Sequence, residues 1–396
     1  MPKTTFSKSF ILIMAITCGV CAGSNYYNQP LIYAIAESLQ VSVEKAAVTI
    51  VISQFAYALG LILLIPLGDR FSKRKIILVL MILSGCAQIL ISFSTQLWSL
   101  YVLSFAATIF SIASQVLIPF ISSISETEKM SEIIGTLMSG LFMGILVARS
   151  YAGIVATFAD WHVVYLSSGI FILLLSAVMY FKLPIPAAAN HQIKILEIYQ
   201  SLFSIAKRSP QLIRRGWVGA MAFSSMILAL STMAFVLANP PYSFSELYIG
   251  LFGFVGLAVV YATKWAGRKI DASHEKLVAI MGSLFLVLQW LLLFFAQQSL
   301  MIYVVGLLCG YSGLSIMHVL NQSIVLRNTD ETRSRQHSIY MFMYFMGAGL
   351  GSMTGVYAWY HWGWIGCCVF GMCFSLLALL FDAIDRLKIQ KTLSSY

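Results

Sequence analysis

The sequence predicts an all-α membrane protein with twelve transmembrane helices in two pseudo-symmetric six-helix bundles, and three observations support this fold class. The 396 residues are 59% hydrophobic and only 10% charged, whereas soluble domains carry about 25% charged residues. Twelve apolar segments are long enough to cross a bilayer core, which takes about 20 residues per helix. The lysines and arginines gather in alternate loops, as membrane topology favours.

The expected spans are closed helices, because unpaired backbone groups are not tolerated in lipid. They cover residues 9–36, 46–66, 76–95, 98–122, 132–157, 162–183, 214–238, 246–264, 276–296, 299–325, 334–357 and 362–382. The first apolar run follows Lys3 and Lys8, as in a signal peptide. Eleven further apolar segments follow it, so the first is expected to be a retained span.

The positive charges predict the orientation of the chain. With the N-terminus in the cytoplasm, 23 of the 25 lysines and arginines fall in cytoplasmic loops. Lys45 lies outside, and Arg149 lies within a span. An even number of spans then leaves both termini in the cytoplasm. The net charge of +10 is therefore attributed to topology and not to nucleic-acid binding.

The longest polar connection divides the spans six and six. We expect an N-terminal bundle over residues 1–183, a cytoplasmic linker over 184–213 and a C-terminal bundle over 214–396. Within the linker, residues 193–205 form an amphipathic pattern. That stretch is either a helix along the inner membrane surface or a solvated connection.

Two pairs of residues indicate that the halves are repeats. Asp69 and Asp271 are 202 residues apart, and so are Gly153 and Gly355. Each glycine is followed by a short loop that contains tryptophan. Equal offsets are typical of a parallel repeat of two six-helix halves.

The loop between spans 2 and 3 carries a family motif. The run from Ile65 to Arg74 reads IPLGDRFSKR and resembles the G-x-x-x-D-R-x-G-R-K signature of the major facilitator superfamily. Ile65 and Ser72 stand where the signature has glycines. The resemblance covers essentially the whole chain, and Gly267 and Asp271 match the corresponding loop of the second half.

Span 5 resembles the efflux signature of drug–proton antiporters. The run from Gly144 to Gly153 reads GILVARSYAG, and its small residues allow close helix packing. Arg149 replaces the proline of the signature. The run NYYNQP from Asn25 to Pro30, and His318 with Asn321, further resemble bacterial permeases often described as sugar or arabinose efflux proteins.

The resemblance implies a monomeric secondary transporter of the bacterial inner membrane that works by alternating access and proton antiport. In the family, the aspartate and arginine of the loop motif steady one state. The expected gating residues are Asp69, Arg70, Lys73, Arg74, Gly267 and Asp271. A charged anchor with no switching role is the alternative. Span 1 lacks the family's frequent acidic coupling residue, so coupling is expected either through His318 or Asp69 or without protons.

Arg149 is the charge that the sequence places deep in a span. Such a charge costs at least about 2.5 kcal/mol on insertion scales and usually faces a cavity or bundle interior. The acidic residues, including Asp382, are expected at span ends or in loops. Water or an anionic ligand is then the expected partner of Arg149, whose planar fork suits carboxylate or phosphate. The alternative is a structural arginine bonded to backbone carbonyls.

Polar side chains elsewhere in the spans suggest a binding cavity. Asn25, Asn28 and Gln29 are expected on one face of span 1, with Pro30 bending the helix and freeing the carbonyl of Tyr26. Helix–helix hydrogen bonding is the alternative. The expected substrate-binding residues are Asn25, Asn28, Gln29, Gln54, Gln115, Arg149, His318, Asn321, Tyr340 and Tyr344. Histidine is the side chain that titrates near neutral pH, which makes His318 the candidate within the spans for proton coupling, although a satisfied core histidine fits equally well.

These features predict export of a small amphipathic molecule, anionic if Arg149 binds it, such as a carboxylate metabolite or siderophore. The alternatives are a sugar or multidrug exporter in which Arg149 is structural, and a small-metabolite importer. The sequence has no G-x-x-x-x-G-K-[ST] run. The C-x-x-C spacing of Cys18 and Cys21 has no second pair nearby and is attributed to helix packing, so no ATP, cofactor or metal is expected. It offers no acid–base set for an enzyme within the membrane. The expected partners are the cargo, a proton and the bilayer.

Overall fold

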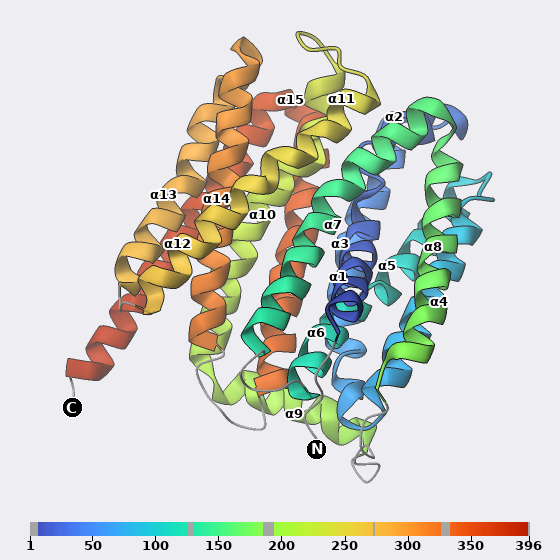
Figure 1. The fold of residues 1–396 in the computed structure, drawn as a ribbon. Helices are drawn as coiled ribbons and strands as arrows, with labels where there is room; N and C mark the ends of the chain where they lie inside the picture. Colours follow the sequence, from blue (N-terminus) through green and yellow to red (C-terminus); the bar gives the residue numbers. More distant parts are fainter. Residues whose placement is uncertain (1–6, 125–129, 185–193, 272–273, 326–332, 395–396) are drawn as a thin grey trace. The chain divides into compact units, whose positions relative to one another are not determined.

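The computed structural model describes residues 7–124, 130–184, 194–271, 274–325 and 333–394. Within these ranges the chain is helical, with no strand (Figure 1). It divides into two compact units. Unit 1 comprises residues 1–199 and 244–254, and unit 2 comprises residues 200–243 and 255–396.

Unit 1 contains the first six predicted spans and the start of the eighth. Its elements are α1 (Lys8–Gly23), η1 (Ser24–Tyr26), α2 (Ile32–Ser38), α3 (Val43–Leu63), η2 (Pro66–Asp69), α4 (Lys73–Ile91), α5 (Leu97–Phe110), α6 (Ala113–Ile124), α7 (Met130–Phe158), α8 (Trp161–Lys182) and α11 (Glu246–Leu251). The fourth span is interrupted between α5 and α6 by a turn at Ser111.

Unit 2 contains the remaining spans. Its elements are α10 (Pro210–Ala238), α12 (Val259–Asp271), α13 (Glu275–Phe294), η4 (Ala296–Gln298), α14 (Leu300–Val325) and α15 (Arg333–Ser394). Two further elements cross the boundary between the units, α9 (Ile195–Arg208) and η3 (Phe252–Ala258).

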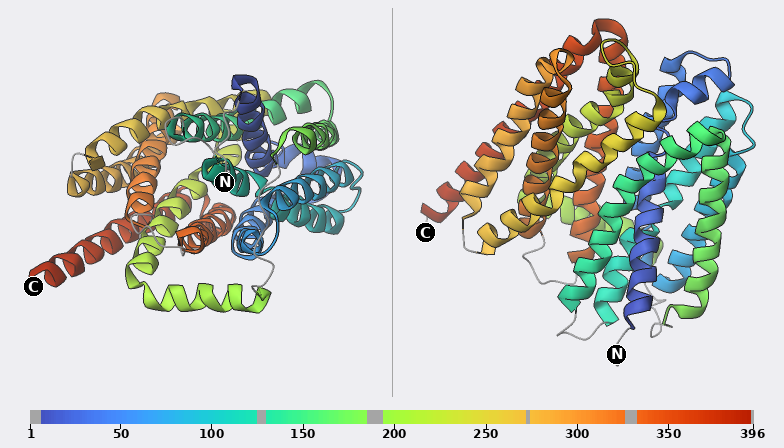
Figure 2. Two further views of the ribbon diagram at one scale, coloured as in Figure 1. Left: turned by 60° about the horizontal axis from the view of Figure 1, so that its bottom comes forward. Right: turned by 45° about the horizontal axis from the view of Figure 1, so that its top comes forward.

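Eleven helical stretches among the described residues are long and apolar enough to cross a membrane. The last, over residues 335–388, has 54 residues. Gly363 breaks it with a φ of 63°, a left-handed conformation that glycine adopts without strain. The two parts make twelve spans, which confirms the predicted fold class. The end of α15 projects beyond its neighbours in unit 2 (Figure 2).

The amphipathic stretch of the linker is a helix, α9. Ile198 and Leu202 are buried, whereas Leu196 and Phe203 are exposed. The hydroxyl of Tyr199 donates to the carbonyl of Leu63 at 2.6 Å. A helix with apolar side chains on more than one side fits a place at the membrane surface, which remains a prediction. Residues 185–193 of the predicted linker lie outside the described residues.

Each unit joins its first and fifth spans through a seam of glycines. In unit 1, a Cβ on Gly140 would lie 2.4 Å from the carbonyl oxygen of Ala15, and one on Gly144 would lie 2.2 Å from Cα of Gly19. Helices α1 and α7 therefore touch backbone to backbone. Small residues four apart allow this approach in membrane helices.

The seam in unit 2 lies between α10 and the first part of α15. A Cβ on Gly347 or Gly351 would lie 2.1 Å from the carbonyl oxygens of Ala220 and Ser224, respectively. The hydroxyl of Ser224 also donates to the carbonyl of Gly347 at 2.6 Å. The same pair of spans is thus joined in the same way in both units, as a repeat predicts.

The first seam gives a stability prediction. Gly144→Ala is expected to lower the free energy of unfolding by about 1–3 kcal/mol, because the new Cβ cannot fit against Gly19. Thermal unfolding of the purified protein in detergent measures this. Gly135→Ala is the matched control on α7, since nothing lies within 4 Å of a Cβ there. Equal losses of stability for both variants would contradict the seam.

Candidate functional site

Arg149 lies in the second half of α7 and is 1% exposed. Its Nε donates to Oε1 of Gln29 at 2.8 Å. Its guanidinium carbon lies 4.9 Å from the centre of the Tyr26 ring, within the range of a cation–π interaction. A buried positive charge in unit 1 therefore contacts a neutral amide and an aromatic face, both from the chain just after α1.

Helix α11 packs on α7 beside Arg149. A Cβ on Gly250 would lie 2.8 Å from the carbonyl oxygen of Arg149, and one on Gly253 would lie 2.6 Å from that of Leu146. The hydroxyl of Ser150 donates to the carbonyl of Gly250 at 2.9 Å. These contacts help fix the backbone that carries the arginine. The start of predicted span 8 thus belongs to unit 1.

The amides of span 1 do not share one helical face, which corrects the sequence expectation. Helix α1 ends at Gly23, and a short 3₁₀ turn and further turns follow until Ile32. Pro30 lacks an N–H group and cannot continue a helix across this stretch. Gln29 consequently turns to Arg149, whereas Asn25 and Asn28 turn to the interior of unit 1.

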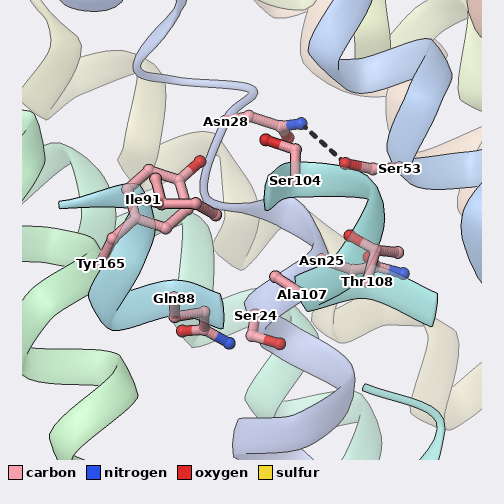
Figure 3. Close-up of a pocket in the computed structure, with 10 residues that line it drawn as sticks. All are labelled: Ser24, Asn25, Asn28, Ser53, Gln88, Ile91, Ser104, Ala107, Thr108 and Tyr165. Carbon is pink, nitrogen blue, oxygen red and sulfur yellow. Dashed lines mark hydrogen bonds between the residues drawn. The ribbon is translucent and has the colours of Figure 1, made fainter. Parts of the chain in front are cut away.

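Asn25 and Asn28 line a polar cavity of about 10 Å³ with side chains from α3, α4, α5 and α8 (Figure 3). Nδ2 of Asn28 donates to the hydroxyl of Ser53 at 3.2 Å. Oδ1 of Asn28 and Oε1 of Gln88 are buried and accept no hydrogen bond from the described residues. A polar space of this size suits one water molecule.

The other predicted polar residues of unit 1 are also internal. Gln54 of α3 is fully buried. Nε2 of Gln115, at the start of α6, donates to the hydroxyl of Tyr57 at 3.3 Å. Both amide atoms of Gln54 are buried without a hydrogen-bond partner among the described residues, whereas the bond of Gln115 to Tyr57 joins α6 to α3.

His318 of α14 is the centre of a polar and aromatic group in unit 2. Nε2 of Gln322 lies 2.9 Å from its Nε2, and the Tyr340 hydroxyl lies 3.3 Å from its Nδ1. The ring of Tyr344 lies 4.5 Å from the imidazole, centre to centre. The predicted residues His318, Tyr340 and Tyr344 are therefore in contact, and Tyr340 also hydrogen-bonds Asn321.

The orientation of the Gln322 amide is linked to the tautomer of His318. With the amide nitrogen toward the ring, Nε2 of His318 accepts from Gln322 and Nδ1 carries the ring hydrogen toward Tyr340. A proton arriving from outside would bind at Nε2. Gln322 would then have to turn its amide oxygen to the ring.

A buried cluster of ion pairs in unit 2 was missed by the sequence analysis. Nη1 of Arg215 lies 2.8 Å from Oδ1 of Asp382, and its Nε lies 2.7 Å from Oδ2 of Asp385. Arg386 pairs with Asp382, and Arg214 pairs with Asp385. Both carboxylates are 0% exposed.

This cluster corrects two expectations. Arg149 is not alone as a buried charge, and Asp382, expected at a span end or in a loop, is buried within a helix that continues past the predicted span. Helix α10 begins at Pro210 and α15 continues past Asp385, so these charges lie within helical turns. The cluster also joins the His318 group, because Nη1 of Arg215 donates to Oδ1 of Asn321 at 3.4 Å. The sequence did contain a sign of the cluster: Arg214 and Arg215 stand at the start of span 7, and Asp382 and Asp385 at the end of span 12.

The predicted gating loop begins with η2 and leads into α4. Nη2 of Arg74 donates to the carbonyl of Tyr180 at the end of α8, and its guanidinium lies 5.4 Å from the Tyr180 ring. Arg70 lies against Phe71. Gly267 and Asp271 are on the last turns of α12. Arg74 therefore anchors the loop within unit 1, and the gating roles of all six residues remain predictions.

Twelve apolar spans in two units, with polar residues gathered inside each, define a multi-pass membrane transporter architecture. The family model described as Major Facilitator Superfamily matches residues 14–352. The chain belongs to this superfamily. It is a membrane transporter of small molecules and not an enzyme.

Similar proteins and structures agree with this assignment. An uncharacterized transporter, YgaY, of Escherichia coli O157:H7 is 33% identical over 380 residues, covering 96% of each chain. A bicyclomycin resistance protein homolog of Haemophilus influenzae is 23% identical over 253 residues, covering 63% of this chain and 60% of that protein. The nucleoside transporter NupG has the same fold, with a TM-score of 0.73 at 12% identity over 94% of this chain and 98% of its own.

The ion-pair cluster predicts unequal effects for two adjacent arginines. Arg215→Met is expected to cost about 3–5 kcal/mol, because it leaves two carboxylates buried without their main partner. Arg214→Met should cost less, since the side chain of Arg214 is 27% exposed and Asp385 keeps Arg215. Melting temperatures in detergent compare the two. A larger loss for Arg214→Met would contradict this arrangement.

Proposed function

We propose that this protein is a bacterial inner-membrane exporter that moves a small amphipathic anion outward in exchange for protons. The observation that carries the proposal is Arg149, a permanently charged side chain that is 1% exposed within a membrane-spanning helix. A cation held at this depth is costly and marks substrate or ion pathways in transporters. Its fork geometry favours a carboxylate-bearing metabolite or a siderophore.

The contacts of Arg149 support a role in binding. Oε1 of Gln29 accepts a hydrogen bond from Nε of Arg149, and the ring of Tyr26 lies against the guanidinium group. The Gln29 amide and the Tyr26 ring are neutral, and they orient the guanidinium group. Both follow the end of the α-helix α1, with Tyr26 at the end of the 3₁₀ turn η1 and Gln29 in the turns after it. Such broken helices form ligand sites in many transporters.

His318 is the proposed proton-coupling residue. Its Nε2 already accepts from Gln322, and Tyr340 and Tyr344 enclose the ring. The other titratable or charged groups near it are His337, which is close enough to act electrostatically, and Arg215 beyond Asn321. Protonation at Nε2 requires a turn of the Gln322 amide, which links proton binding to a local rearrangement.

The remaining features of the proposal follow the superfamily. Alternating access opens the site to each side in turn, with Asp69, Arg70, Lys73 and Arg74 steadying one state. Gly267 and Asp271 take the equivalent place in the second half. We propose that the protein acts as a monomer with both termini in the cytoplasm. The distribution of its lysines and arginines supports that orientation.

Drug or sugar export is the second candidate, with Arg149 as a structural element. The bicyclomycin resistance homolog among the relatives favours it, and so does the engagement of Arg149 by two side chains of its own unit. A comparison of metabolites in the medium of cells with and without the gene separates the candidates. Anionic metabolites that accumulate only with the gene support anion export.

The proposed role of Arg149 predicts a charge-selective defect. Arg149→Ala is expected to weaken export of a carboxylate-bearing substrate about tenfold or more, which is the loss expected for a charged hydrogen bond. Arg149→Lys should recover only part of it, because lysine keeps the charge but not the planar fork. Uptake into inverted proteoliposomes measures the rates. Unchanged transport of every accepted substrate by Arg149→Ala would refute anion binding.

The proposed role of His318 predicts a loss of coupling. His318→Gln is expected to abolish the stimulation of export by a pH gradient, while substrate exchange without a gradient continues. His361→Gln, an exposed histidine of α15, is the matched control and should keep the stimulation. Both measurements use the same proteoliposomes. Full pH-driven transport by His318→Gln would exclude this residue as the coupling site.

A further inference from the structure

Unit 2 contains a cavity that the proposed transport site does not use. Its volume is about 480 Å³, and it is lined by Gln211, Arg215, Glu275, Lys276, Ala279, Leu320, Ile324, Ala383, Arg386 and Leu387. These residues come from α10, α13, α14 and α15. All lie near helix ends that gather at one end of unit 2 (Figure 1). Such ends are at the level of lipid headgroups in a bilayer.

The charged side chains of the cavity favour an anion. Arg215, Lys276 and Arg386 line the cavity together with Glu275. When Arg214, Asp382 and Asp385 of the ion-pair cluster are included, four positive charges stand against three negative charges. Asp382 and Asp385 are 0% exposed, and both pair with Arg215. They hold the guanidinium groups in place but do not line the cavity themselves. Lys276 is exposed.

The backbone adds to this preference. Helix α13 begins at Glu275, and its N-terminal residue His274 gives no side-chain capping bond. The first N–H groups of a helix lack intrahelical acceptors and attract negative charge. A helix of 20 residues thus directs its positive end to the same space as Lys276.

The rest of the lining is apolar. Leu320, Ile324, Ala383 and Leu387 provide a hydrocarbon wall, and Leu387 is 58% exposed. The neighbouring surface continues this wall with Leu380 and Ile384, which are 52% and 37% exposed. A basic pocket beside an apolar outer surface suits a molecule with an anionic head and acyl chains.

We infer that this cavity binds the phosphate headgroup of an anionic phospholipid, with its acyl chains along the outer face of α15. Lys276 and the positive end of α13 receive the phosphate, while Arg215 and Arg386 form the wall behind it. Zwitterionic lipids are bound more weakly, because their ammonium group is repelled by the same side chains. The site does not depend on which cargo the transporter carries.

Native mass spectrometry of the purified protein tests the inference. With added phosphatidylglycerol, we expect bound lipid on the intact chain and a higher melting temperature. Phosphatidylethanolamine should give less of both. Lys276→Gln should weaken phosphatidylglycerol binding about fivefold, the effect of one basic residue near a membrane surface. Lys276 is exposed and not paired in the ion cluster, so this variant should fold.

Lys269→Gln, on the neighbouring helix α12, is the matched control and should bind normally. Equal binding of the two lipids would overturn the inference, as would an equal loss in both variants. Inorganic phosphate is the third arm. If it raises the melting temperature as much as phosphatidylglycerol does, the cavity binds free phosphate and not a lipid. None of these outcomes bears on Arg149 or His318, so the proposed transport function stands or falls separately.

Discussion

The cost of placing charge and unpaired polar groups in hydrocarbon governs this structure. Among the described residues, four buried charged side chains lie within helices: Arg149, Arg215, Asp382 and Asp385. Each is met by side chains from other parts of the chain: an amide and a ring for Arg149, and opposite charges for the others. Unit 1 places an amide and an aromatic ring against its buried arginine, whereas unit 2 pairs buried arginine and aspartate side chains with one another.

Much of the fold followed from the sequence because lipid imposes simple rules. Length and hydropathy located the spans, and their number and class are confirmed. The breaks and turns within the spans could not be predicted from the sequence. The break after Gly23, the turn at Ser111 and the 3₁₀ stretch over residues 252–258 depend on tertiary contacts, such as those of Gly250 and Gly253 with α7. Hydropathy windows average over such features.

The candidate site was predictable only in part. His318, Tyr340 and Tyr344 do meet, as expected of polar residues on spans 10 and 11. The span 1 amides diverge because helical periodicity was extended through a stretch that is not helical. The ion cluster was missed because its charges stand at the ends of apolar runs, where sequence places loops. The bounds of α10 and α15 show that Arg215, Asp382 and Asp385 lie in helices, and their exposed fractions show that they are buried.

The glycine seams have a genetic consequence. Glycine alone lacks a Cβ, so every nucleotide change that alters the residue at Gly140, Gly144, Gly347 or Gly351 adds an atom where the neighbouring backbone already stands. No conservative replacement exists at these codons. The apolar residues facing lipid can be exchanged freely by comparison. Natural drift in this chain should therefore be confined to its outer surface, while the two lines of backbone contact stay unchanged.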